Sequence, residues 1–169
     1  SGNVLYLSTF SKLLAPGLRV GWAALPQELV AKFTHAKQGL DLHTGSLAQA
    51  VAYEACRDGL LDRHVPMIRA TYHTRRDAML AAIDTYMPKA VVSTRPKGGM
   101  FLWLTLPSHI DTSALLQRAL EQNVAFVPGA AFHANGGGTH TMRLNFSHSA
   151  PERITEGVKR LAGSIAEVL

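Results

Sequence analysis

The 169-residue sequence has few of the features that mark several common protein classes. Cys56 is the only cysteine, so no intrachain disulfide can form, and we interpret this residue as a small buried filler within a helix. No apolar run is long enough to span a bilayer, so no membrane partner is expected. The first residues also lack the basic and hydrophobic regions of a signal peptide, which leaves the cytoplasm as the expected location.

Metal and nucleic-acid sites are also poorly supported. The eight histidines show no His-x-x-x-His spacing, and we expect no metal. The net charge of +5 comes without a run of five or more basic residues, so no nucleic-acid partner is expected for this chain. An anionic cofactor and carboxylate substrates would account for the positive balance equally well. The glycines of Asn135-Gly-Gly-Gly-Thr139 lack the flanking strand and helix of a nucleotide site, and they indicate a surface loop.

What the sequence does contain is an ordinary composition and an alternation of predicted strands and helices. With 47% hydrophobic and 17% charged residues, the chain can bury a core. Periodicity predicts strands over 3–9 and 19–25, helices over 26–39 and 46–57, and a long helix from Pro66 to Tyr86. Beyond Pro88 it predicts strands over 90–94, 100–106, 124–127 and 141–146, a helix over 111–122, and a last helix opened by a capping box at Ser149-Ala-Pro-Glu152. We expect an α/β fold with a domain boundary near residue 88.

The segment around Lys12 has the chemistry of an anion site beside an amine. The first predicted strand ends in hydroxyl residues, and the turn Ala15-Pro16-Gly17 sends the chain back, so that Arg19 returns towards Lys12. Thr9, Ser11 and Arg19 then supply two hydroxyls and a guanidinium, a set that suits a phosphate dianion. Lys12 could attack a carbonyl carbon of the same ligand, and we expect it to be partly buried, because burial favours the neutral, nucleophilic amine.

These residues carry a family resemblance. The run Ser/Thr-x-Ser-Lys followed by Ala-Pro-Gly-Leu-Arg is matched at Thr9, Ser11, Lys12 and 15–19. In this the chain resembles the class I/II aminotransferases, which are fold-type I enzymes dependent on pyridoxal phosphate, and especially the aminoadipate and kynurenine aminotransferase branch. The resemblance implies that Lys12 forms a Schiff base with pyridoxal phosphate, and that Thr9, Ser11 and Arg19 bind the cofactor.

The resemblance covers essentially the whole chain and corresponds to the C-terminal part of the family's proteins. Residues 1–88 would be the end of the large pyridoxal-phosphate-binding domain with the interdomain helix, and residues 89–169 the α+β small domain. We therefore expect this chain alone to be inactive. The complete protein would be a homodimer that transfers an amino group between an amino acid and a 2-oxo acid, with 2-oxoglutarate as the expected acceptor.

Arg143 is the candidate for substrate binding. It lies on a predicted strand of apolar residues, so its guanidinium needs an anionic partner if it is buried. Periodicity alone leaves an edge-strand arginine or a structural ion pair equally open. The resemblance implies that Arg143 binds the substrate carboxylate.

Two further segments match family patterns less specifically. Pro128 and Gly129 would shape a loop at the mouth of the active site, with Phe132 as a substrate-side contact, although a plain hairpin turn explains this segment equally well. Tyr72, Arg75 and Arg76 match a Tyr-x-x-Arg-Arg-Asp pattern, which we interpret as packing and ion pairing along the long helix.

Two alternatives remain open at this point. One is the effector domain of a winged-helix (GntR-type) transcription regulator, in which an aminotransferase-like module keeps the same lysine motif. The other is a truncated product with no activity of its own. The sequence does not select among aminoadipate, kynurenine, aromatic and branched-chain substrates.

Overall fold

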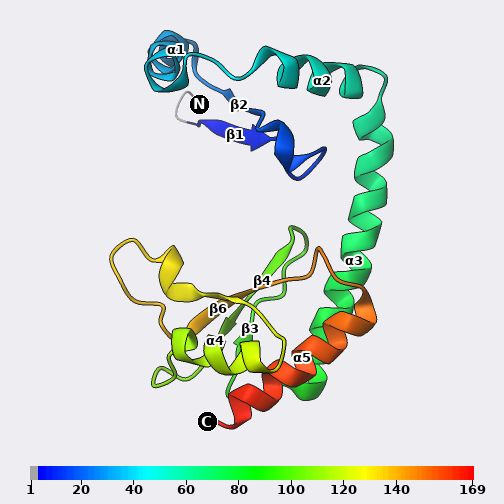
Figure 1. The fold of residues 1–169 in the computed structure, drawn as a ribbon, viewed down its shortest axis with the longest axis vertical. Coiled ribbons are helices and arrows are strands. Elements are labelled where there is room, and N and C mark those ends of the chain that lie inside the picture. Colours follow the sequence, from blue (N-terminus) through cyan, green and yellow to red (C-terminus); the bar gives the residue numbers. More distant parts are fainter. Residues whose placement is uncertain (1–3) are drawn as a thin grey trace. The chain divides into compact units, whose positions relative to one another are not determined.

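The computed structural model describes residues 4–169, in which helices and strands are mixed along the chain as the predicted α/β class requires (Figure 1). The chain divides into two compact units, with the division between Ile68 and Arg69. The boundary near residue 88 stays a prediction for the family's domain organisation. Within the described residues, no helix combines the length and the apolar character needed to cross a membrane.

The first unit contains a β-hairpin, two complete helices and the beginning of α3 (Leu60–Tyr86), which continues into the second unit. Strand β1 (Tyr6–Thr9) pairs antiparallel with β2 (Gly21–Ala24), and Thr9 lies opposite Gly21. A short 3-10 helix, η1 (Pro16–Leu18), lies in the connection. The helices α1 (Gln27–Asp41) and α2 (Ser46–Arg57) follow. The strand predicted over 3–9 is confirmed from residue 6 onwards, and Asn3 lies outside the described residues.

The first unit buries very little apolar surface of its own. Among its described hydrophobic residues only Val20 and Ala52 are buried. Large apolar side chains instead stand in solvent, with Leu40 84% and Leu47 79% exposed. Burial of apolar area is the main favourable contribution to folding. The hairpin and helices of this unit therefore gain little stability from a core within the described chain.

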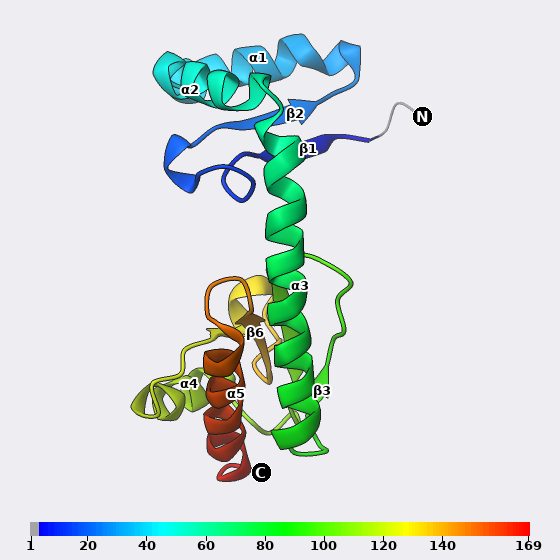
Figure 2. The same ribbon diagram turned by 90° about the vertical axis from the view of Figure 1, so that its right-hand side faces the viewer.

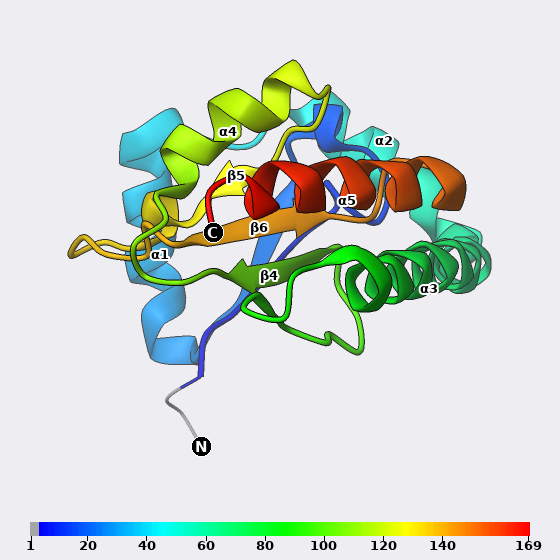
Figure 3. The same cartoon turned by 90° about the horizontal axis from the view of Figure 1, so that it is seen from below.

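The second unit is built on a four-stranded antiparallel sheet with the order β3-β4-β6-β5. Its strands are β3 (Val92–Ser93), β4 (Phe101–Thr105), β5 (Val127–Pro128) and β6 (Thr141–Asn145). Helices α4 (Thr112–Glu121) and α5 (Pro151–Ala166) cover one face of the sheet together with the C-terminal half of α3 (Leu60–Tyr86). Figures 2 and 3 show α5 beside that half of α3.

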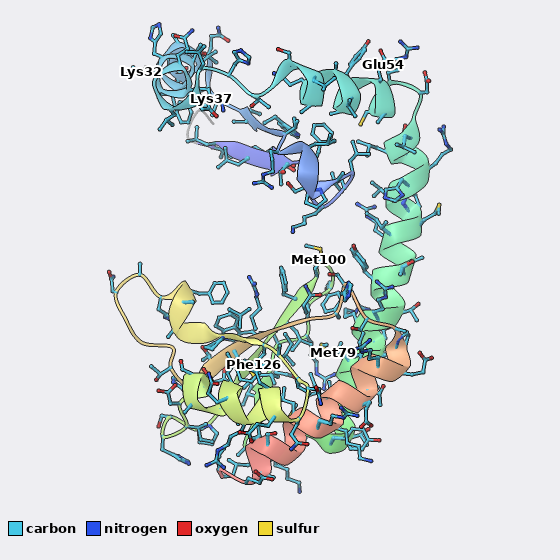
Figure 4. All side chains as sticks on the ribbon, in the orientation of Figure 1. Lys32, Lys37, Glu54, Met79, Met100 and Phe126 are labelled. Carbon is cyan, nitrogen blue, oxygen red and sulfur yellow. The ribbon has the colours of Figure 1, made fainter. Side chains whose placement is uncertain are left out.

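The core of the second unit lies between this sheet and the three helices. Residues of β4 alternate, so that Leu102 and Leu104 are buried while Phe101, Trp103 and Thr105 point to the other face. Each buried leucine lies opposite a buried residue of β6. Met79 of α3 and Phe126 lie in this core and are labelled in Figure 4. Within the described residues, α3, α4 and α5 thus pack on one face of the sheet, and Phe101, Trp103 and Thr105 lie on the other.

Several predictions about the ends of elements are wrong. Helix α3 begins at Leu60, with Pro66 inside it, because Pro66 removes only one backbone donor and the long helix that follows outweighs this local cost. Helix α5 has Ala150 as its N-cap with no side-chain hydrogen bond, so the predicted capping box does not form, although Pro151 does lie in the first turn. The strand predicted over 90–94 forms only at Val92–Ser93, and in place of the strand predicted over 124–127 the structure has a two-residue strand at Val127–Pro128.

Candidate functional site

A tight turn of the first unit holds Lys12. The backbone N–H of Phe10 donates to the Val20 carbonyl at 3.0 Å and extends the hairpin by one residue beyond β1. The Phe10 carbonyl then accepts from the N–H of Leu14 at 2.8 Å. The chain therefore turns directly after β1, and Lys12 lies within that turn.

Hydrogen bonds join the two predicted hydroxyl residues. The Thr9 hydroxyl oxygen accepts from the Ser11 N–H at 3.1 Å and lies 2.9 Å from the Ser11 hydroxyl. It also lies 3.1 Å from the Val20 carbonyl, to which it can donate. Because Thr9 has one hydroxyl proton for these two acceptors, the Ser11 hydroxyl is the better placed of the two to donate to an outside ligand. The structure confirms that Thr9 and Ser11 lie together.

Arg19 closes the same turn. Its backbone is left-handed, with φ 53°, and its guanidinium donates to the Pro16 carbonyl at 3.1 Å. That contact uses one N–H group, and the side chain is exposed, so other donors of the fork remain free. Val20 lies next to Arg19 in the chain and accepts from Phe10. The hairpin therefore brings the backbone of Arg19 back beside the end of β1, as the turn signal predicts.

The electrostatics of this segment favour an anion. No aspartate or glutamate occurs between residues 4 and 27, and the first acidic residue is Glu28. Within the described residues, Lys12 and Arg19 take part in no ion pair. The expectation that Lys12 is partly buried is wrong for this chain, because its side chain is exposed. No described residue of the first unit covers the Lys12 side chain.

The donors at this turn fit a phosphorylated aldehyde. A hydroxyl pair and a guanidinium fork are suited to the oxygens of a phosphate, and a primary amine is the group that condenses with an aldehyde. Lys12 and Arg19 form no ion pair within the described residues, and the segment itself contains no carboxylate, so both cations are available to such a ligand. Pyridoxal phosphate is therefore compatible with Thr9, Ser11, Lys12 and Arg19.

Arg143 belongs to the second unit and lies on the sheet face opposite α3, α4 and α5. It is half-buried on β6, opposite Trp103 of β4 and Val127 of β5. Because β6 has a neighbour on each side, the edge-strand alternative is wrong. Among the described residues, the guanidinium makes no hydrogen bond or ion pair, so the structural ion-pair alternative has no partner within this part of the chain. Its unpaired donors are available to an anion.

Aromatic rings surround this guanidinium. Its central carbon lies 4.1 Å from the centroid of the Phe101 ring and 4.6 Å from that of Phe132. The ring of Phe132 meets that of Trp103 edge to face, with 5.3 Å between centroids. Our sequence interpretation did not identify Phe101 and Trp103. The two-residue period of a strand places Phe101 and Trp103 on one face of β4, and only the pairing of β4 with β6 shows that Arg143 lies on that face.

The loop that carries Phe132 is not a plain hairpin turn. Pro128 ends β5, and Gly129–Phe132 form a 3-10 helix, η2. Gly129 is buried, and an added Cβ there would lie 1.8 Å from the Thr141 hydroxyl. The proline and glycine therefore shape the loop as expected. Phe132 follows and contacts Arg143.

The arginine pair of α3 has the structural role that we expected. Arg75 donates to the Ser147 carbonyl. Arg76 donates to the Lys97 carbonyl at 3.2 Å and pairs with Asp77 at 2.7 Å. Both guanidinium groups thus hold backbone segments of the second unit against α3. The predicted site residues consequently form two groups, one in each unit.

Comparison with known proteins identifies the relatives of the chain. Aromatic-amino-acid aminotransferase 1 of Thermococcus litoralis is 49% identical over 166 residues, covering 98% of this chain and 40% of the relative. The 2-aminoadipate transaminase of Thermus thermophilus is 47% identical over 167 residues, covering 99% and 42%. A crystal structure of Pyrococcus horikoshii kynurenine aminotransferase in complex with PMP superposes with a TM-score of 0.94 at 48% identity, covering 100% of this chain and 42% of that one.

A second group of relatives matches at lower identity. An HTH-type transcriptional regulator of Bacillus subtilis is 30% identical over 168 residues, covering 99% of this chain and 34% of the regulator. The chain spans about two fifths of the length of the aminotransferases that it matches. The model of the family described as aminotransferase class I and II matches residues 1–161, which include both the Lys12 turn and the Arg143 strand. The chain therefore belongs to the class I and II aminotransferase family.

Proposed function

We propose that the complete protein is a pyridoxal-phosphate-dependent aminotransferase, which transfers an amino group between an amino acid and a 2-oxo acid. The observation that carries the proposal is the turn after β1, which contains the hydrogen-bonded pair Thr9 and Ser11, then Lys12, and closes at Arg19, with no carboxylate in the segment. Membership of the aminotransferase family supports it. We take 2-oxoglutarate as the expected acceptor.

Each residue has a distinct role in this proposal. When bound, pyridoxal phosphate supplies the carbonyl carbon that receives the amino group and a ring that stabilises negative charge at the substrate Cα. The Ser11 hydroxyl and the Arg19 fork hold the phosphate, and Thr9 orients Ser11 by its hydrogen bonds. Lys12 holds the cofactor at rest, and once displaced its amine moves a proton to and from the substrate Cα.

Arg143 binds the carboxylate that all substrates of this class share. Its guanidinium is half-buried and has no anionic partner within the described chain. Relatives named for aromatic amino acids and for 2-aminoadipate differ in the side chain that they accept. What those amino acids have in common is the α-carboxylate. This supports a role for Arg143 that is independent of the side chain.

The oligomeric state and the cellular location of the complete protein are also part of the proposal. Exposed apolar side chains of the first unit, including Leu40, Leu47 and Tyr53, support their burial by the rest of the complete protein or by a second subunit. We propose a homodimer on this basis, and a cytoplasmic location stays a prediction. This chain alone, with Lys12 exposed, is expected to be inactive.

A regulator is the second candidate. The relatives that include a helix-turn-helix regulator support it, although at 30% identity against 49% for the aminotransferase. In that case the complete protein would carry a DNA-binding segment and would bind pyridoxal phosphate without turnover. Sequencing the gene upstream of Ser1 and assaying transamination separate the two functions.

Removing the amine of Lys12 tests the enzyme proposal. In the complete protein, Lys12→Ala should lower turnover by about a hundredfold or more, which is the usual contribution of a positioned acid-base group. The measurement is 2-oxo acid formation with pyridoxal phosphate, together with borohydride reduction and mass spectrometry to locate the cofactor on Lys12. Lys32→Ala, on the exposed surface of α1, is the control and should keep full activity. Turnover near the wild-type rate in Lys12→Ala would contradict the assignment.

Replacing Arg143 by lysine tests carboxylate binding. A lysine keeps the charge and loses the two-pronged contact, so we expect the KM for the amino acid to rise about tenfold, the equivalent of about 1.4 kcal/mol. The cofactor should remain attached to Lys12, as judged by the same reduction experiment. An unchanged KM would remove Arg143 from the substrate site.

A further inference from the structure

Arg143 is held in an unusual way for a half-buried arginine. Such a side chain normally pairs with a carboxylate or donates to backbone carbonyls, as Arg76 does in the same unit. The guanidinium of Arg143 does neither within the described chain, and its recorded contacts there are the rings of Phe101 and Phe132. Both ring centroids lie within the range of about 6 Å in which a cation is attracted to an aromatic face.

Strand pairing explains why Phe101 reaches Arg143. In the β4–β6 register, Trp103 lies directly opposite Arg143, and Phe101 lies opposite Asn145. Phe101 is therefore a diagonal neighbour of Arg143 on the same face, which a long side chain can span. This contact is set by the sheet and does not depend on a loop.

The ring of Phe132 is positioned by the η2 loop and by contact with the ring of Trp103. Phe132 ends η2, whose first residue, Gly129, packs closely against Thr141 of β6. At the other end of η2, Phe132 meets Trp103 edge to face, with 74° between the ring planes. Such a pair is favourable beyond the area that it buries. Trp103 thus limits where Phe132 can lie over Arg143.

Rings hold an arginine without using its hydrogen-bond donors. An acidic partner would orient the guanidinium but would also occupy its N–H groups and neutralise its charge. Aromatic rings attract the cation through their faces and are poor acceptors, so the donors remain free. The arrangement therefore combines a fixed position with an unsatisfied charge, which is what a site for an incoming carboxylate requires.

We propose that Phe101 and Phe132 are positioning residues that hold the Arg143 guanidinium ready for a substrate carboxylate, with Trp103 as the brace of Phe132. The inference rests on the proposed function, because it takes the carboxylate to be that of the amino acid. None of the three rings needs to touch the reacting atoms for this role.

Leucine substitution at the two ring positions tests the proposal in the complete protein loaded with pyridoxal phosphate. Phe132→Leu and Phe101→Leu keep apolar volume and remove the ring, and each should raise the KM for the amino acid about threefold to thirtyfold, with kcat within about twofold of wild type. Phe132→Tyr keeps the ring and should restore the KM. A merely structural role would lower the melting temperature and would leave the KM of the folded variants unchanged.

A matched control is available in the same unit. Tyr86 offers its ring to Lys159 at 6.0 Å, in a cation–π pair that involves neither Arg143 nor η2. Tyr86→Leu should leave the KM unchanged. If Phe101→Leu and Phe132→Leu both match the wild-type KM, or if Tyr86→Leu raises it equally, the positioning role is overturned.

A second measurement separates this proposal from the proposed function. In the 169-residue chain, the Nε–H resonance of Arg143 should be shifted by the nearby rings and should move on addition of 2-oxoglutarate. Both effects should be smaller in Phe132→Leu, where only the Phe101 ring remains beside the guanidinium. Absence of transamination in the wild-type complete protein would defeat the proposed function, and the resonance would still decide the positioning role. An Arg143 resonance that is the same in wild type and Phe132→Leu would overturn it.

Discussion

At the scale of single residues, Arg19 has a backbone conformation that favours glycine and a side chain with a predicted role in phosphate binding. Its φ of 53° is in the left-handed region, where a residue with a Cβ is strained by about 1–3 kcal/mol and glycine is not. The guanidinium reaches the Pro16 carbonyl and helps to close the turn. Glycine would relieve the strain at this position but would lose the guanidinium. An arginine here therefore fits the predicted role of its side chain in binding phosphate.

Gly129 lies at a position that has no room for a side chain. A Cβ at this position would lie 1.8 Å from the Thr141 hydroxyl and 2.8 Å from the carbonyls of Gly138 and Thr141. Two of these atoms belong to the backbone and cannot move away alone. The close approach of η2 to β6 therefore depends on the absence of a Cβ.

We predict that Gly129→Ala destabilises the second unit by about 1–3 kcal/mol or more, because the added methyl group overpacks a buried contact. Thermal unfolding followed by circular dichroism measures the change. Gly163→Ala is the control: it lies in α5 with no atom within 4 Å of the added Cβ, and alanine should stabilise the helix by about 1 kcal/mol. Equal melting temperatures for Gly129→Ala and wild type would show that the loop can move away from β6.

At the scale of elements, periodic segments were predictable and irregular ones were not. The bounds of α2 are those predicted, and β4 lies inside its predicted range, because each has a regular apolar pattern and clear breakers at its ends. The start of α3 was missed because a single proline in a long helix is a local cost that the rest of the helix outweighs. Ser149-Ala-Pro-Glu152 has the spacing of a capping box, but α5 begins with Pro151 and no side-chain cap.

In the candidate site, contacts between residues close in sequence were predictable, and contacts between distant residues were not. Thr9 and Ser11 meet because they are two residues apart at a strand end, so their proximity follows from local chain geometry. The contacts of Arg143 come from β4 and η2, which are 42 and 11 residues away in sequence at Phe101 and Phe132. Lys12 was expected to be partly buried, yet burial depends on what packs over the turn, and motif spacing says nothing about that.

At the scale of the whole molecule, the two units differ in how they are stabilised. The hydrophobic core cluster lies entirely in the second unit, from Met79 to Ile165. The first unit has its hydrogen-bonded hairpin and helices, but a two-stranded hairpin is marginal by itself in water. We infer that the two units respond very differently to loss of an apolar side chain.

The same truncation should therefore have different effects in the two units. Leu104 is fully buried, and Leu104→Ala should lower the free energy of unfolding by about 2–5 kcal/mol. Leu40 is 84% exposed, and Leu40→Ala should change it by less than about 0.5 kcal/mol. Trp22 and Trp103 are the two tryptophans and lie one in each unit. Urea unfolding of the second unit can be followed by Trp103 fluorescence in a Trp22→Phe background, and that of the first unit by Trp22 fluorescence in a Trp103→Phe background. Equal losses in the two variants would contradict the difference between the units.

The exposed apolar surface of the first unit has a consequence for mutational tolerance. In the 169-residue chain alone, polar substitutions at Leu40, Leu47 or Tyr53 remove no buried contact and should be accepted, with a gain in solubility. In the complete protein, the same substitutions become harmful wherever another segment or subunit covers the position. A substitution scan carried out at both chain lengths would then map the covered surface residue by residue, as the set of positions whose tolerance is lost when the polypeptide is complete.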